Sequence, residues 1–156
     1  MCGIVAYIGK RQASPILLDG LRRLEYRGYD SAGIALWTDG GIDVYRKAGR
    51  IENLRKAVSE ANPPGDLGIS HTRWATHGAP TDENAHPHKD QSGKLALVHN
   101  GVIENYQTIK LQLLAEGHTF HSETDTEVLS HLVGKCYDES EETDPQARLI
   151  AAVQMA

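Results

Sequence analysis

The sequence has few cysteines and no long apolar run. Its two cysteines, at positions 2 and 136 of 156 residues, are too few for the disulfide framework of a small secreted domain. No stretch is long and apolar enough to cross a membrane, and none has the charged, apolar and small-residue order of a signal peptide. These absences predict a cytoplasmic protein that does not interact with a membrane.

Clustered positive charge is also missing. The chain has 16 lysines and arginines against 21 acidic residues, a net charge of −5, and its basic residues are scattered along the sequence. A nucleic-acid-binding surface needs concentrated positive charge, so nucleic acid is not an expected partner. The chain also lacks internal repeats and low-complexity tracts. Its length and its 40% hydrophobic content predict one globular domain with a substantial core.

Five short apolar segments predict β-strands, because they are rich in β-branched and apolar side chains and are bounded by turn residues. The predicted strands cover residues 4–8, 31–37, 42–47, 67–72 and 95–98. Several of them follow one another through short turns, and the chain shows no strict alternation of strand and helix. This order indicates antiparallel pairing and an α+β layered fold.

Helix signals lie between and after these strands. Ser14 is placed to cap the first helix, with Pro15 at its first position and Gly28 to end the segment. A capping box at Thr124 opens a later helix, and Cys136 on the apolar face of that helix is predicted to lie in the core. The other predicted helices start near residues 51, 105 and 145. The long polar segment 73–94 has the length of a functional loop.

Cys2 is the residue around which a chemical hypothesis can be built. Removal of Met1 would make Cys2 the N-terminal residue, with a thiol and a free α-amine on one Cα. An α-amine has a pKa of about 7.7–8.0, so near neutral pH it can accept the proton of a neighbouring thiol and activate it. The apolar strand that follows would anchor this terminus. The alternative is that Cys2 is a small hydrophobic residue at the start of a strand.

Three further polar clusters could supply a site: residues 26–33, residues 71–78, and residues 99–101 with residues 122–125. The planar fork of Arg73 suits a carboxylate, and Asp125 at a helix N-terminus could hold an ammonium group. Asn100 and Gly101 offer N–H donors of the kind that stabilise an oxyanion in acyl transfer. With a cysteine nucleophile, these groups could cleave the amide of an amino acid. Taken singly, they could equally be a surface ion pair, a helix cap and a turn.

The same stretches resemble the class II glutamine amidotransferases. The similarity rests on residues 2–5, 24–33, 71–78, 99–101 and 122–127, which occur in the order of the family motifs. The tyrosine-containing segment 26–33 and the segment 73–78 are most similar to the sugar branch, the glutaminase domains of glucosamine-6-phosphate synthases. The resemblance covers nearly the whole chain.

This resemblance implies an N-terminal-nucleophile hydrolase fold, a four-layer αββα sandwich of two antiparallel sheets flanked by helices. It implies that Cys2 attacks the side-chain amide of glutamine with its own α-amine as base. Ammonia leaves, and water hydrolyses the resulting γ-glutamyl thioester. Asn100 and Gly101 would form the oxyanion hole. No cofactor or metal is implied.

The resemblance also assigns residues to substrate binding. Arg73 would bind the glutamine α-carboxylate and Asp125 its α-amine. The pocket would further be formed by Thr76, His77 and, on a loop that closes over it, Trp74. Two residues of a motif near the nucleophile are possible supports: Arg27 and Gly28.

The resemblance predicts partners as well. In the full-length enzymes, sugar-isomerase domains receive the ammonia and use it to convert fructose 6-phosphate to glucosamine 6-phosphate, and the protein is expected to be a homo-oligomer. The family's glutaminase domain continues beyond residue 156. Residues 1–156 are therefore expected to form a domain that is incomplete at its C-terminus, without the isomerase domains, and to be unstable or self-associating alone.

Two alternatives remain at this point. A metal-binding module could use the imidazoles of His71, His77 and His99 with those of His86 and His88. A non-catalytic remnant of the family could instead bind glutamine or a partner chain without hydrolysing it.

Overall fold

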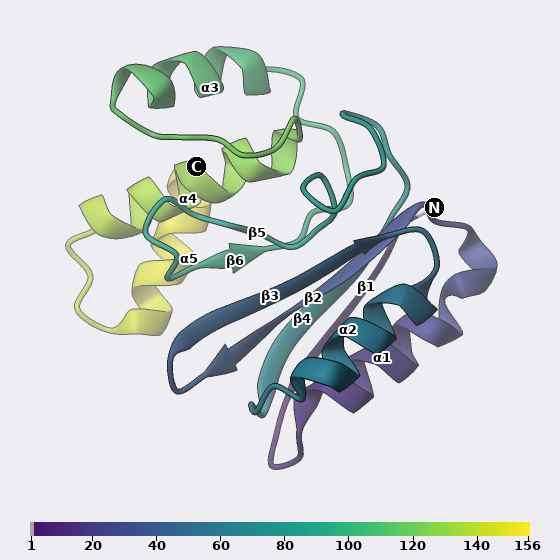
Figure 1. Cartoon of the computed structure of the whole chain (residues 1–156). Coiled ribbons are helices and arrows are strands. Elements are labelled where there is room, and N and C mark those ends of the chain that lie inside the picture. Colours follow the sequence, from purple (N-terminus) through teal and green to yellow (C-terminus); the bar gives the residue numbers. More distant parts are fainter. Residues whose placement is uncertain (1) are drawn as a thin grey trace.

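A computed structural model describes residues 2–156; Met1, on which the hypothesis of methionine removal depends, lies outside the described residues. The centre of the fold is an antiparallel sheet of four strands in the order β1-β4-β2-β3 (Figure 1). The strands are β1 (Gly3–Ile8), β2 (Ser31–Thr38), β3 (Gly41–Ala48) and β4 (Leu67–Arg73). The sequence predicted all four within two residues at each end, and their antiparallel pairing is confirmed.

The register of this sheet places Cys2 beside the end of β4. Gly3 pairs with Thr72, and the Gly3 N–H donates to the Thr72 hydroxyl at 2.9 Å. Because the two strands run antiparallel, Cys2, just before β1, and Arg73, the last residue of β4, lie at the same end of the sheet. On the other side of β4, Ser31 at the start of β2 pairs with Arg73. Three strand ends thus meet where the sequence predicted a site.

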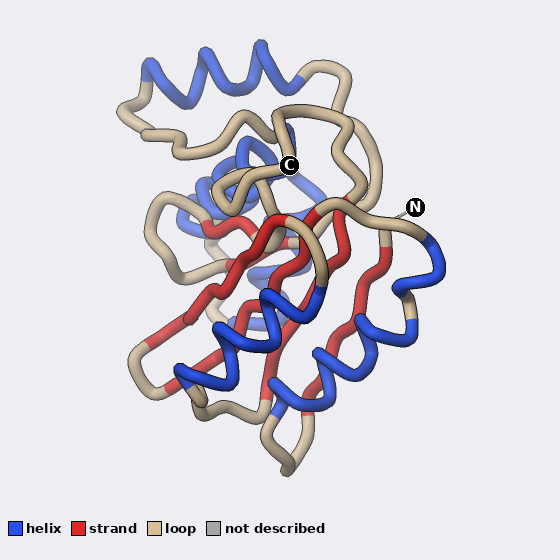
Figure 2. Tube along the Cα trace, turned by 45° about the vertical axis from the view of Figure 1, so that its right-hand side comes forward, coloured by secondary structure: helices blue, strands red, loops and turns tan. Residues whose placement is uncertain are grey.

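Two helices cover one face of the sheet, α1 (Ala13–Arg23) and α2 (Ile51–Ala61) (Figure 2). Their buried side chains pack on alternate residues of β2 to form the main core. Ile51, Leu54 and Val58, the face predicted from spacing, are all buried. Burial of each such side chain contributes roughly 1.5–3 kcal/mol.

The start of α1 corrects one prediction. Ser14 does not cap the helix, which begins at Ala13 after Gln12 and has no side-chain cap. The carbonyl of Gly65 instead accepts a hydrogen bond from the Ala13 N–H at 2.8 Å. Pro15 fits within the first turn because the N–H that it lacks would have had no partner inside the helix. The 3₁₀ turn after α1 (Glu25–Arg27) ends at Gly28 with a positive φ of 74°, as the sequence predicted.

The opposite face of the sheet carries a second layer (Figure 1). It consists of a two-stranded sheet, β5 (His88–Lys89) with β6 (Ala96–Leu97), and the helices α3 (Tyr106–Ala115), α4 (Asp125–Glu139) and α5 (Pro145–Met155). The chain is therefore layered helix, sheet, sheet, helix. The predicted strand 95–98 is reduced to the two residues of β6, which pair with the two residues of β5. None of the helices in residues 2–156 is both long and apolar enough to cross a bilayer.

The helices of this second layer begin as predicted. Thr124 accepts a hydrogen bond from the Glu127 N–H at the start of α4, and Asp144 accepts one from the Ala147 N–H at the start of α5. The Glu127 carboxylate binds the Ser122 N–H at 2.7 Å and does not reach back to the cap residue. Cys136 lies in the core between α4 and α5, where burial raises the pKa of its thiol.

An apolar groove of about 710 Å³ separates the two layers at the end of the sheet away from Cys2. Its lining includes side chains of β2, β4, α4 and α5, among them Trp37, Leu67, Ile69, Tyr137 and Leu149. It contains no residue that the sequence proposed for chemistry.

Candidate functional site

A pocket of about 150 Å³ lies where β1 begins, β4 ends and α4 begins. It brings together residues from four separate parts of the chain. Eight residues that the sequence singled out line it: Cys2, Arg73, Trp74, Thr76, His77, Asn100, Gly101 and Asp125. The two possible supports, Arg27 and Gly28, do not line the pocket. Gly28 instead lies beneath Trp74, since a Cβ built on it would be 3.3 Å from the indole ring.

The thiol of Cys2 is held by the backbone of the neighbouring loop. The Trp74 N–H donates to the Cys2 Sγ at 3.2 Å. The Sγ in turn lies 3.9 Å from the carbonyl oxygen of Trp74, within reach of the thiol proton. Hydrogen bonds donated to sulfur favour the thiolate, which is the nucleophilic form. The sulfur is half-buried and faces the pocket.

Asn100 and Gly101 line the same pocket as this sulfur. The side-chain amide of Asn100 donates to the carbonyl of Cys2 at 3.3 Å, which ties the two chain segments together. A side chain on Gly101 would have to displace the His99 ring, because a Cβ there would be 2.8 Å from its Nε2.

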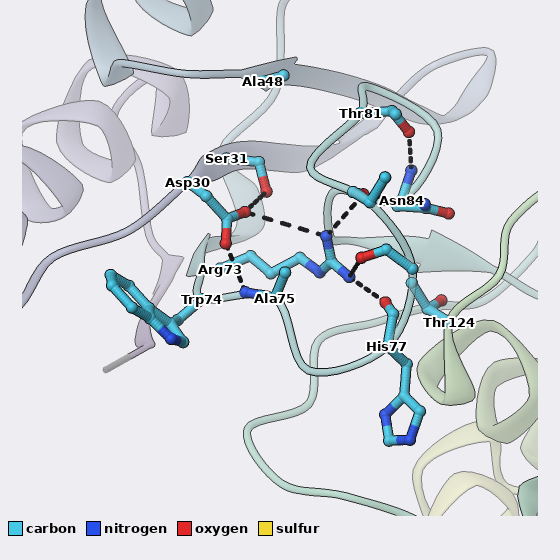
Figure 3. A network of polar contacts seen from close by, with 12 residues as sticks. Asp30, Ser31, Ala48, Arg73, Trp74, Ala75, His77, Thr81, Asn84 and Thr124 are labelled. Atoms are coloured by element: carbon cyan, nitrogen blue, oxygen red, sulfur yellow. Dashed lines mark hydrogen bonds and ion pairs between the residues drawn. The ribbon is translucent and has the colours of Figure 1, made fainter.

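Arg73 is almost fully buried, with only 3% of its surface exposed. Its two terminal nitrogens donate to backbone carbonyls of the loop that follows: Nη2 to those of His77 and Gly78, and Nη1 to that of Ala79 at 3.3 Å. Figure 3 shows this fork of contacts, with the His77 ring pointing away from the guanidinium. Burial lowers the pKa of Arg73, and the nearby carboxylate of Asp30 opposes that shift.

Asp125 starts α4 and is buried at the pocket wall. One of its oxygens accepts a hydrogen bond from the Ile103 N–H at 2.9 Å and lies 3.9 Å from the Nδ1 of His77. A carboxylate in this position presents negative charge to the pocket, opposite the cationic Arg73. The two charges suit a ligand with a carboxylate at one end and an ammonium group at the other.

The loop between β4 and β5 is fixed to the rest of the fold by acidic and amide side chains. Asp82 accepts hydrogen bonds from the Ala48 N–H at 2.7 Å and from Lys47 at 2.6 Å. Asn84 is buried and bonds both the backbone and the side chain of Glu123. The loop is therefore an ordered part of the site, and Trp74 on it remains 56% exposed at the pocket mouth.

The sequence indicates His71, His86 and His88 only as possible metal ligands and does not predict that all three are buried at or beside the pocket. His71 on β4 stacks on His86 with ring centroids 4.4 Å apart, and His86 meets the edge of His88. Burial lowers the pKa of His71 to about 4 and that of His88 to about 3, and it lowers the pKa of His86 still further. The only sequence signal was the alternation of β4, which puts His71 on the same face as Ile69.

These imidazoles predict that the protein is sensitive to acid. They stay neutral in the folded chain, while in the unfolded chain each gains a proton near pH 6.5. Unfolding is therefore favoured as the pH falls below about 6.5, and their effect is absent above it. Between pH 7 and pH 5 the free energy of unfolding should fall by about 2 kcal/mol for each of the three.

Urea unfolding at several pH values measures this loss. His88→Gln should reduce the loss of unfolding free energy between pH 7 and pH 5 by about 2 kcal/mol, the share of one imidazole. A free energy of unfolding that is the same at pH 7 and pH 5 would contradict neutral burial of the three rings.

The histidine-based metal site finds no support in this geometry. Within residues 2–156, the structure contains no group of three or more His, Cys, Asp or Glu side chains arranged to hold a metal ion. The rings of His71, His86 and His88 pack against one another face to face or edge to face. Such packing does not point their nitrogens at a common centre.

Residues 56–141 match a protein family described as "Glutamine amidotransferase domain". A glutamine–fructose-6-phosphate aminotransferase (isomerizing) of Thermus thermophilus is 60% identical over 137 residues, covering 88% of this chain and 23% of the relative. The Mycobacterium bovis protein of the same name is 52% identical over 156 residues, covering 98% of this chain and 25% of the relative. The chain thus spans about a quarter of the length of these relatives.

Two solved structures are similar over nearly the whole chain. A glutamine phosphoribosylpyrophosphate amidotransferase from B. subtilis, complexed with ADP and GMP, matches with a TM-score of 0.75 and 30% identity. A structure described as the allosteric regulatory enzyme of purine biosynthesis matches with a TM-score of 0.77 and 28% identity. Each match covers 99% of this chain and 33% of the other.

Proposed function

The chain belongs to the glutamine amidotransferase family and has the N-terminal-nucleophile hydrolase fold predicted from its sequence; on this premise we propose that it hydrolyses the side-chain amide of glutamine. The observation that carries the proposal is the convergence in one pocket of a cysteine, two charged residues of opposite sign and two oxyanion donors. The products would be glutamate and ammonia.

The proposed nucleophile is the Sγ of Cys2. Once Met1 is removed, the α-amine of Cys2 accepts the thiol proton and the sulfur attacks the amide carbon. The Trp74 N–H at 3.2 Å supports the ionised sulfur before the attack. The tetrahedral intermediate then loses ammonia, which takes up the proton held by the α-amine. Water completes the reaction by hydrolysing the γ-glutamyl thioester.

The proposed oxyanion hole is formed by the Asn100 side chain and the Gly101 N–H. In the present structure the Asn100 amide donates to the Cys2 carbonyl. To serve the oxyanion, it would exchange this bond for one to the substrate oxygen. A donor of this kind acts on charge that exists only in the transition state, so it raises kcat more than it strengthens substrate binding.

Arg73 and Asp125 are the proposed contacts for the two ends of glutamine. The buried guanidinium would bind the α-carboxylate in exchange for some of its bonds to the loop carbonyls, and Asp125 would bind the α-ammonium group. Thr76 and His77 would line the pocket between them, and Trp74 would close its mouth. Arg27 and Gly28 would act only as supports, since Gly28 lies under the Trp74 ring.

Arg73→Ala should mainly raise the KM for glutamine. The α-carboxylate is charged in both ground and transition states, so its partner contributes uniform binding. Loss of a buried charge partner should raise KM by roughly 100-fold. The melting temperature should also fall, because carbonyls at residues 77–79 lose their donor.

Steady-state kinetics and a thermal melt of the Arg73→Ala and Arg73→Lys variants separate these two effects. Lysine keeps the charge but not the planar fork, so its KM should lie between those of the wild type and the alanine variant. An unchanged KM with a lowered melting temperature would restrict Arg73 to holding the loop.

The direct test of the proposed function is release of glutamate from glutamine by the purified protein. Intact mass should show a chain that begins at Cys2, since with Met1 attached the Cys2 nitrogen is an amide and cannot act as a base. Glutamate release by that species supports the proposal. Glutamine binding without any glutamate release would favour a non-catalytic binding domain.

For the whole protein, we propose that the ammonia serves amino-sugar synthesis in the cytoplasm. The relatives named above are glutamine–fructose-6-phosphate aminotransferases, and this chain corresponds to about a quarter of their length. A fused isomerase domain with a fructose 6-phosphate site would then be its partner. Glucosamine 6-phosphate should form only when that domain, glutamine and fructose 6-phosphate are present together.

A further inference from the structure

Asp30 lies beside the pocket without lining it, and no role has yet been given to it. It is the residue immediately before β2, and its carbonyl accepts a hydrogen bond from the Gly49 N–H at 2.7 Å. The Ser31 hydroxyl donates to its Oδ1 at 2.9 Å. These bonds hold both the backbone and the side chain of Asp30 in place. The carboxylate therefore has one orientation, toward the loop that follows β4 (Figure 3).

From this position Asp30 binds the chain on both sides of Trp74. Its backbone N–H donates to the carbonyl of Arg73 at 2.8 Å, and its Oδ2 accepts a hydrogen bond from the Ala75 N–H at 2.5 Å. Contacts to the residues immediately before and after Trp74 fix the path of the backbone between them. Between these two contacts lies the N–H of Trp74, which donates a hydrogen bond to the Sγ of Cys2.

We propose that Asp30 is a positioning residue for the nucleophile: by holding the Trp74 peptide from both sides, it keeps the Trp74 N–H directed at the Cys2 sulfur. The proposal rests on the function proposed above, because it gives this N–H the task of stabilising the thiolate. Asp30 itself touches neither the sulfur nor the substrate. It acts by fixing the direction of one backbone donor, the Trp74 N–H.

The charge of Asp30 has the opposite electrostatic effect. Its Oδ1 lies 4.0 Å from the Nη1 of Arg73, so the carboxylate partly neutralises the cation next to the pocket. If charge alone mattered, removing the carboxylate would leave more positive charge near Cys2 and make the thiol easier to ionise. Loss of the hydrogen bond from the Ala75 N–H to the carboxylate would make the thiol harder to ionise, because the Trp74 peptide would then be held only by the backbone bond between Asp30 and Arg73. The two effects therefore predict opposite shifts.

The experiment is the pH dependence of Cys2 alkylation by iodoacetamide, with Cys2 followed by peptide mapping so that the buried Cys136 does not interfere. In Asp30→Ala, the midpoint of the pH–rate profile should move to higher pH by about one unit. Alkylation below the midpoint should then be about ten-fold slower than in the wild type. Asp30→Asn should shift the midpoint less, since an amide oxygen can still accept from the Ala75 N–H.

Asp82→Asn is the matched control. Asp82 also accepts a hydrogen bond from a backbone N–H at 2.7 Å and pairs with a cation, but its contacts are to residues 47 and 48 of β3, away from the Trp74 peptide. A comparable decrease in melting temperature is expected for Asp82→Asn, with no shift in the alkylation profile.

Three results would overturn the proposal: a midpoint that moves to lower pH in Asp30→Ala, a midpoint that does not move in that variant, or an equal shift in the Asp82 control. If Asp30→Ala does not fold, Asp30→Val, which also removes both the charge and the acceptor, takes its place. Alkylation needs no glutamine, so the test is independent of turnover. A wild-type protein without glutaminase activity would reject the proposed function and leave the positioning of Cys2 measurable.

Discussion

Cys2→Ala should abolish glutamate release, with a decrease in kcat of at least about 10⁴-fold. The expectation follows from the position of the sulfur, which accepts a hydrogen bond from the Trp74 N–H and shares its pocket with Asn100 and Gly101. Without it no thioester can form, and the remaining groups can only bind glutamine. The fold should be nearly unaffected, because the half-buried side chain at the chain end contributes little to the core.

Cys136→Ala is the matched control for this variant. Cys136 packs between α4 and α5, so its loss should lower the melting temperature while kcat stays near the wild-type value. A glutamine analogue with an electrophilic γ-carbon should label Cys2 and spare Cys136. Undiminished hydrolysis by Cys2→Ala, measured as glutamate formed over time, would rule out the proposed mechanism.

Asn100→Ala should lower kcat by roughly 100- to 1,000-fold, the usual cost of removing one oxyanion donor. The KM for glutamine should change little, because the neutral amide of the substrate needs this donor less than the oxyanion does. The variant also loses the hydrogen bond from Asn100 to the Cys2 carbonyl. A small decrease in stability is therefore expected along with the kinetic effect.

Asn105→Ala provides the comparison in the same segment. Asn105 precedes α3 and makes no side-chain capping bond, so its replacement should leave both kcat and KM unchanged. If Asn100→Ala instead raised KM with kcat preserved, the amide would contact the ground-state substrate, and the oxyanion would have to be stabilised by other donors.

The secondary structure was predictable where spacing alone determines it. Ile51, Leu54 and Val58 recur at helical spacing and are all buried in α2. The start of α1 was not predictable, because the partner of its first N–H is the carbonyl of Gly65, some fifty residues further along the chain. A local capping signal at Ser14 carries no information about such a distant acceptor.

The identities of the pocket residues came largely from motifs, whereas their contacts did not. Nothing in the sequence around Arg73 indicates that its guanidinium binds the carbonyls of residues 77–79, because this depends on the path of the following loop. His71 could be placed on an inner face of β4 by alternation, but its stacking on His86 depends on how the loop returns to the sheet. Sequence therefore identified the groups, and the fold supplied their geometry.

The strand order has a consequence for how the chain assembles during synthesis. β1 pairs only with β4, and the contact between Gly3 and Thr72 spans 69 residues. The β2–β3 hairpin can close early, but the N-terminal strand has no partner until residues 67–73 have left the ribosome. The pocket around Cys2 is thus among the last parts of the domain to form. Throughout that interval the amino terminus is held by no strand, so the residue before Cys2 can be trimmed without opening the sheet.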